Sequence, residues 1–102
     1  MCGIIGINSN KSVSSSIINS LKKLEYRGYD SAGIATLSDG LINEVKSEGR
    51  VDNLEKNSLV QGMEGTIGIG HVRWATHGLP NSVNAHPHSS LNVSVVHNGI
   101  IE

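Results

Sequence analysis

The residues best suited to chemistry stand at the start of the chain, Met1-Cys2-Gly3. Methionine aminopeptidase removes an initiator methionine when the next side chain is small, so we expect the mature chain to begin at Cys2. That residue then carries a nucleophile and a base together, because the thiolate is the reactive form of cysteine and an α-amino group titrates near ~7.7–8.0. N-terminal nucleophiles activated by their own amine are a known catalytic solution. The alternative is a buried or incidental cysteine.

Donors for such a nucleophile stand near the other end of the sequence. If Cys2 attacks an amide carbonyl, the oxyanion of the tetrahedral intermediate needs hydrogen-bond donors, each contributing ~10²–10³ in rate. The Asn98 side-chain amide and the Gly99 backbone N–H offer two. Glycine also lets the main chain take a positive φ and approach a substrate. The alternative is a plain type I′ hairpin turn, which Asn-Gly also indicates, and the two interpretations are compatible.

A candidate binding segment begins at Arg73, after a predicted strand. A guanidinium fork suits the bidentate capture of a carboxylate. Trp74 can cover a bound ligand, and Thr76 and His77 can add polar contacts. The alternative is a surface arginine stacked on Trp74.

Two further groups of residues keep alternatives open. His86-Pro87-His88 raises a zinc hypothesis, but no third ligand stands at a sensible spacing, and the histidines also suit a proline-stiffened loop. Arg27 and Asp30 can form a simple ion pair within a loop. They can equally brace the N-terminus, because this segment returns toward the first strand after one helix.

Composition excludes several classes of protein. With 102 residues, the chain forms one domain at most, with a modest core. A net charge of −1 and an aromatic content of 3% argue against nucleic-acid binding. Cys2 is the only cysteine, which excludes an intramolecular disulfide and a cysteine-cluster metal site. We find neither a signal peptide nor an apolar run near the ~18 residues of a membrane span, so we expect a soluble, cytoplasmic protein.

Hydrophobic periodicity predicts short strands joined by tight turns and one clear helix. The helix covers residues 13–24, where Val13, Ile17, Leu21 and Leu24 fall at helical spacing. The remaining predicted elements are strands at 3–7, 31–37, 41–47, 66–72 and 92–97, a polar helix within 49–59, a long loop at 73–91, and hairpin turns at Asp39-Gly40 and Asn98-Gly99.

This pattern favours an α+β fold with largely antiparallel sheets. The partner strand after Asn98-Gly99 has barely begun at Glu102, so we expect the chain to be truncated relative to its natural domain. The Gly65–Gly70 region completes no phosphate-binding motif, which argues against nucleotide binding.

Five sequence blocks together resemble one known family. They are MCGIIG at 1–6, LEYRGYDSAG at 24–33, GHVRWATHG at 70–78, NAHPH at 84–88 and VHNGIIE at 96–102. Their order and content resemble the glutaminase domain of the glucosamine-6-phosphate synthases, which are class II glutamine amidotransferases of the N-terminal nucleophile hydrolase type. Purine-pathway phosphoribosyl amidotransferases, asparagine synthetases and glutamate synthases share the Cys-Gly start but differ in the three middle blocks.

The resemblance implies a four-layer αββα sandwich, of which this chain is a truncated part. It implies hydrolysis of the glutamine side-chain amide through a γ-glutamyl thioester, without cofactor or metal. The ammonia would serve a separate synthase domain that converts fructose 6-phosphate to glucosamine 6-phosphate. The implied catalytic residues are Cys2 as nucleophile with its own amine as base, Asn98 and Gly99 as oxyanion hole, and Arg27, which positions the N-terminus. The implied glutamine-binding residues are Arg73 on the α-carboxylate, Trp74, Thr76 and His77 in the pocket and its closing loop, and His86, a family loop residue.

The resemblance also implies parts that these residues lack. The acidic ligand of the substrate's α-ammonium group, the rest of the sandwich and the sugar-phosphate isomerase domains would follow residue 102. We expect the whole enzyme to be a homo-oligomer, and the fragment alone to bind glutamine weakly and make no amino sugar. Two alternatives stay open: the glutaminase domain of another class II amidotransferase, and a non-catalytic zinc-binding or regulatory module that happens to begin Met-Cys.

Overall fold

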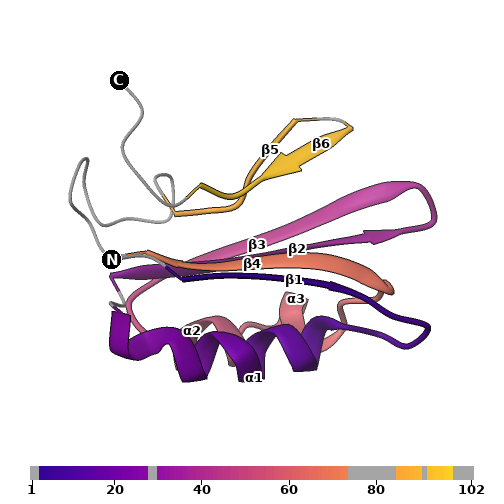
Figure 1. The fold of residues 1–102 in the computed structure, drawn as a ribbon. Helices are drawn as coiled ribbons and strands as arrows, with labels where there is room; N and C mark the ends of the chain where they lie inside the picture. Colours follow the sequence, from indigo (N-terminus) through magenta and orange to yellow (C-terminus); the bar gives the residue numbers. More distant parts are fainter. Residues whose placement is uncertain (1–2, 28–29, 74–84, 91, 98–102) are drawn as a thin grey trace.

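A four-stranded antiparallel sheet forms the centre of the computed structural model, which describes residues 3–27, 30–73, 85–90 and 92–97. The strands follow the order β1-β4-β2-β3, so both central strands pair on each side. Their bounds are β1 (Gly3–Asn8), β2 (Ser31–Ser38), β3 (Leu41–Glu48) and β4 (Ile67–Arg73). Helices cover one face, and a short hairpin lies over the other (Figure 1).

The helical layer comprises α1 (Ser14–Leu24), the 3-10 turn η1 (Glu25–Arg27), α2 (Val51–Glu55) and α3 (Ser58–Gln61). The predicted apolar stripe of α1 is confirmed, because Ile17 and Leu21 are fully buried. Glycine in β4 makes room for them: a Cβ at Gly70 would lie 2.6 Å from Cγ2 of Ile17. At the last turn of α1, Nζ of Lys22 lies 2.7 Å from Oε1 of Glu55, which joins α1 to α2.

The predicted turn at Asp39-Gly40 is confirmed. Asp39 has φ 52° and Gly40 has φ 75°, the positive values that a type I′ turn requires at both central residues. The turn closes the β2-β3 ladder at the Ser38–Leu41 pair. It thereby fixes the register of the edge strand β3.

Two predictions about the elements are wrong. The polar helix expected within residues 49–59 is two short helices, because Asn57 leaves helical geometry and its Oδ1 accepts the N–H of Leu59 at 2.9 Å, capping α3. The buried contacts expected of Val51 and Leu54 are nevertheless present.

The long loop expected at 73–91 contains β5 (His88–Ser90), which pairs with β6 (Val93–Val95). Strand β5 has three exposed residues and therefore no apolar alternation to reveal it.

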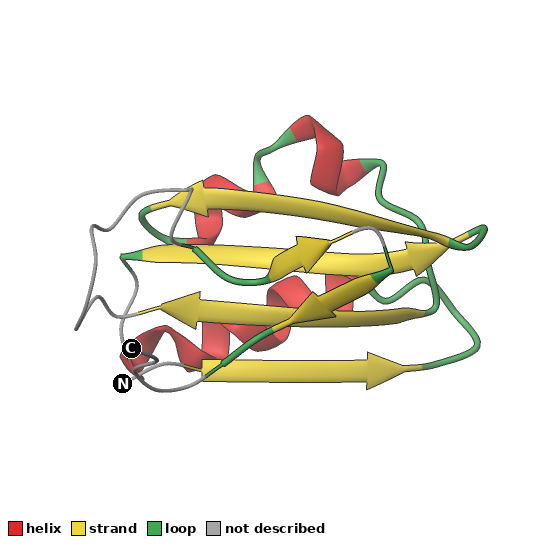
Figure 2. Ribbon diagram, turned by 90° about the horizontal axis from the view of Figure 1, so that it is seen from above, coloured by secondary structure: helices red, strands yellow, loops and turns green. Residues whose placement is uncertain are grey.

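The described residues form three successive layers, and the predicted α+β class is confirmed. Helices pack beneath the four-stranded sheet, and the β5-β6 sheet lies above it, over the central strands (Figures 1 and 2). A second helical layer, expected of a complete αββα sandwich, is not among these residues. In the part of the chain that the structure describes, no helix has the length and apolar character needed to cross a membrane.

The segment that leads into β5 lies directly on the central strand β2. Gly33 makes this possible, since a Cβ there would collide with the carbonyl oxygen of His86 and lie 2.8 Å from Cδ of Pro87. Val72 and the even-numbered residues of β2 point to the helices instead, because side chains alternate across a strand. Gly33 thus sets the distance between the segment and the sheet.

We predict that Gly33→Ala destabilises β2 and residues 85–88 by about 1–3 kcal/mol, since the new methyl group meets main chain that cannot rotate away. Hydrogen–deuterium exchange in the full-length protein measures this as faster exchange of both segments. The matched control is Gly6→Ala in β1, where a Cβ would lie 3.9 Å from Ile69, an ordinary contact. Equal protection in both variants would contradict the packing argument.

Candidate active site

The described parts of the five sequence blocks meet at one end of the main sheet. Gly3, to which Cys2 is joined, pairs with Val72, the neighbour of Arg73. Arg73 itself pairs with Ser31 at the start of β2, and its carbonyl oxygen accepts the N–H of Asp30 at 2.8 Å. The beginning of β1, the beginning of β2 and the end of β4 therefore lie side by side.

The two remaining blocks join this end of the sheet through histidines. The imidazole rings of His71 in β4 and His86 before β5 stack, with centroids 4.3 Å apart and an interplanar angle of 23°. His71 Nε2 lies 2.9 Å from the carbonyl oxygen of His97, and the N–H of His97 donates to His86 Nδ1 at 3.3 Å. His97 is the residue to which Asn98 is joined.

Arg73 is the last residue of β4, and only 8% of its surface is exposed. Strand alternation places its side chain on the face that also carries His71, two residues earlier. The alternative of a surface arginine is therefore wrong. A buried guanidinium at the edge of this face suits the binding of a carboxylate.

Burial keeps the stacked histidines neutral. It lowers the pKa of His71 to about 4, against the opposing effect of the hydrogen bond to the His97 carbonyl. The pKa of His86 is also lowered to about 4; burial is the largest cause, and the electrostatic effect of the neighbouring His71 is the next. Burial also lowers the pKa of His88, whose ring lies against His86 with centroids 4.5 Å apart.

These neutral states assign the ring protons. A carbonyl oxygen only accepts, so His71 carries its proton on Nε2; His86 accepts at Nδ1, so its proton is on Nε2. The remaining ring nitrogen of His71, Nδ1, is buried without a hydrogen-bond partner among the described residues.

The zinc hypothesis finds no support in the part of the chain that the structure describes. It contains no group of three or more His, Cys, Asp or Glu able to hold a metal ion.

Asp30 carries a second buried polar atom at this end of the sheet. Its Oδ1 accepts a hydrogen bond from Ser31 Oγ at 2.9 Å. Its Oδ2 is buried without a partner in the described ranges. Arg27 is the last residue of η1. Its side chain is not among the parts that the structure describes, so the Arg27–Asp30 ion pair stays a prediction.

Of the predicted site residues, the structure brings Arg73 and His86 to the same end of the sheet and places the main chain of Arg27 in η1. Six predicted site residues lie outside the described ranges: Cys2, Trp74, Thr76, His77, Asn98 and Gly99. Sequence reasoning missed His71 and the main chain of His97. The sequence did contain a signal for His71: it stands two residues before Arg73, and residues at that spacing lie on the same face of a strand.

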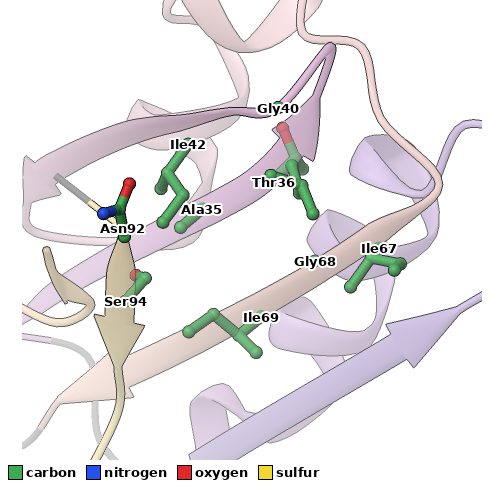
Figure 3. A pocket seen from close by; sticks show the side chains of 10 residues that line it. Ala35, Thr36, Gly40, Ile42, Ile67, Gly68, Ile69, Asn92 and Ser94 are labelled. Carbon is green, nitrogen blue, oxygen red and sulfur yellow. The ribbon is translucent and has the colours of Figure 1, made fainter.

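A hollow of about 250 Å³ between the main sheet and β6 lies away from these groups. Figure 3 shows Ile42, Ile69, Asn92 and Ser94 around it, together with residues from the far ends of β2 and β4. None of its lining residues is titratable. The hollow therefore offers no titratable side chain for acid–base chemistry or for activating the hydroxyls of Thr36 and Ser94.

We predict that acidification loosens the histidine cluster. His71 and His86 titrate at about 4 when folded and near 6.5 when unfolded, so the unfolded chain takes up protons first. The stability that depends on their neutral rings is complete above pH 6.5 and falls as the pH drops from there toward 4. Exchange protection of residues 85–97, corrected for intrinsic rates, should decrease between pH 7 and pH 5, and less so in His71→Gln. Unchanged wild-type protection would contradict this.

Comparisons with known proteins agree with this geometry, although no protein-family model matches the chain. Glutamine–fructose-6-phosphate aminotransferase (isomerizing) from Mesorhizobium japonicum is 56% identical over 102 residues, which are 100% of this chain and 17% of that enzyme. The enzyme of the same name from Clostridium acetobutylicum is 58% identical over 104 aligned residues, with the same coverage. The chain therefore spans about a sixth of the length of these relatives.

Solved structures show the same fold. Glutamine phosphoribosylpyrophosphate amidotransferase from B. subtilis, complexed with ADP and GMP, matches with a TM-score of 0.74 and 26% identity over 92% of this chain and 20% of that one. A structure described as the allosteric regulatory enzyme of purine biosynthesis matches with a TM-score of 0.76 and 26% identity, over 86% of this chain and 19% of that one. The N-terminal nucleophile hydrolase type of fold is thus confirmed. The chain is a homologue, over its whole length, of the N-terminal part of the glutamine–fructose-6-phosphate aminotransferases.

Proposed function

We propose that residues 1–102 are the N-terminal portion of a class II glutaminase domain that hydrolyses the side-chain amide of L-glutamine. The observation that supports the proposal is that the described parts of five separate sequence blocks meet at one end of the main sheet. Blocks that are distant in sequence and adjacent in space are expected of an active site, because chemistry needs several side chains within reach of one substrate.

In this mechanism, the amine of Cys2 takes the thiol proton and the thiolate attacks the amide carbon of glutamine. The Asn98 side chain and the Gly99 N–H stabilise the oxyanion. Collapse of the intermediate, with the proton returned to the leaving nitrogen, releases ammonia and leaves a γ-glutamyl thioester. Water then hydrolyses the thioester to glutamate and restores the thiol. Arg27 positions the N-terminus.

Arg73 binds the α-carboxylate of glutamine in this proposal. The burial of Arg73 supports the role, because an ion pair there is screened less by water than one at an exposed arginine. His71 and His86 are neutral at pH 7, so they bring no pH-dependent charge to the same face near neutrality. Trp74, Thr76 and His77 follow Arg73 and complete the pocket, with His86 at its border.

The ammonia would serve the conversion of fructose 6-phosphate to glucosamine 6-phosphate, in amino-sugar biosynthesis. Support comes from the names of relatives more than 50% identical to the whole chain. The purine-pathway alternative has support from the two solved structures, at the lower identity of 26%. The acidic ligand of the α-ammonium group and the sugar-phosphate domains would belong to the part that corresponds to the remaining five-sixths of the relatives' length. The whole enzyme would be a cytoplasmic homo-oligomer.

We predict that 6-diazo-5-oxo-norleucine, an electrophile that mimics glutamine, labels the full-length protein on Cys2 alone. Peptide mass spectrometry should find the label on an N-terminal peptide that lacks Met1, and excess glutamine should prevent labelling. A protein that retains Met1 and takes up no label would contradict the proposal and favour the non-catalytic module.

A further inference from the structure

We infer that His71 and His86 are positioning residues that together hold the main chain of His97 and so orient the segment that begins with Asn98. The inference deepens the proposed function and rests on it for its catalytic consequence. Neither histidine needs to touch the substrate for this role.

Both polar groups of the His97 backbone are held. His71 Nε2–H donates to the carbonyl oxygen at 2.9 Å, and the backbone N–H donates to His86 Nδ1 at 3.3 Å. The carbonyl of His97 belongs to the planar peptide unit that joins His97 to Asn98. A bond to this oxygen therefore restricts the rotation of the peptide unit that precedes the candidate oxyanion donors, the Asn98 side chain and the Gly99 N–H.

The two histidines are themselves fixed to the main sheet. His71 is fully buried in the central strand β4, paired with Ile4 on one side and Gly33 on the other. The main chain of His86 lies on Gly33, the same partner, and its ring stacks on that of His71. The support for His97 therefore comes from the four-stranded sheet.

The β5-β6 ladder alone gives His97 little support. Each strand has three residues, and isolated two-stranded ladders are marginal in water. Two bonds join the described residues of this hairpin to β3 of the main sheet, one from Ser89 to Glu44 and one between His88 and Lys46. Among the described residues, the backbone of His97 bonds instead to His71 of the main sheet and to His86, which lies on it.

The protonation states suit the two roles. Neutral His71 has its proton on the nitrogen that faces the carbonyl, and neutral His86 presents a lone pair to the N–H. Protonated His86 could not accept at Nδ1. Since donors in an oxyanion hole act on the transition state and not on the bound substrate, a loss of either bond should lower kcat more than it raises KM.

The test uses paired variants of the full-length protein. His71→Leu removes the donor, whereas His71→Gln keeps an N–H donor near the Nε2 position. His86→Leu removes the acceptor, whereas His86→Asn keeps an oxygen near the Nδ1 position. His88→Gln is the matched control, because His88 belongs to the same ring cluster but bonds to Lys46 at 3.5 Å.

We expect both leucine variants to lower kcat for ammonia release from glutamine by ~10–100-fold, part of the ~10²–10³ that one donor provides, with KM changed less than about twofold. His71→Gln and His86→Asn should recover most of the loss, and His88→Gln should match the wild type. Exchange of the His97 amide should be about tenfold faster in His86→Leu than in His86→Asn.

Two results would overturn the inference. One is an unchanged kcat in both leucine variants; the other is equal impairment of each leucine variant and its conservative partner, which would mean that ring packing alone matters. A wild-type enzyme that releases no ammonia from glutamine would refute the proposed function instead. Positioning would then be judged by exchange alone, and unchanged protection of the His97 amide in the leucine variants would refute it.

Discussion

The close contact between Gly33 and the main chain of His86 is the constraint on which the candidate site depends. A residue with a Cβ at position 33 would push the segment before β5 away from the sheet. The His86 ring would then lose its stacking on His71 and its bond to the N–H of His97. The absence of a side chain at position 33 thus determines whether the segment that leads into β5 can lie on the end of the main sheet where β2 begins and β4 ends.

This arrangement uses burial to control both geometry and charge. Burial lowers the pKa of each stacked histidine, which keeps the rings neutral and leaves each nitrogen with a fixed role as donor or acceptor. Arg73 lies on the same face as His71 and is also buried. The guanidinium group and the neutral rings are therefore gathered at one end of the sheet.

Local sequence patterns predicted most of the main sheet and its helix. The spacing of Ile17 and Leu21 identified the buried face of α1, and Asp39-Gly40 identified the β2-β3 turn, because these signals depend on neighbours in sequence. Strand β5 and the break before α3 were missed, since a three-residue polar strand and a single capping asparagine leave the periodicity almost unchanged. The motif blocks predicted segments whose described parts meet at one end of the main sheet, and the roles of their residues stay predictions. The spacing of His71 and Arg73 indicated a shared strand face, but the contacts of His71 were not predictable, because they involve residues 15 and 26 positions away along the chain.

The measurement that tests the central claim most directly is ammonia release from glutamine by the full-length protein with Cys2→Ala, compared with the wild type. Our account predicts that the variant falls to the uncatalysed rate. Glutamine hydrolysis at the wild-type rate without this thiol would contradict the account.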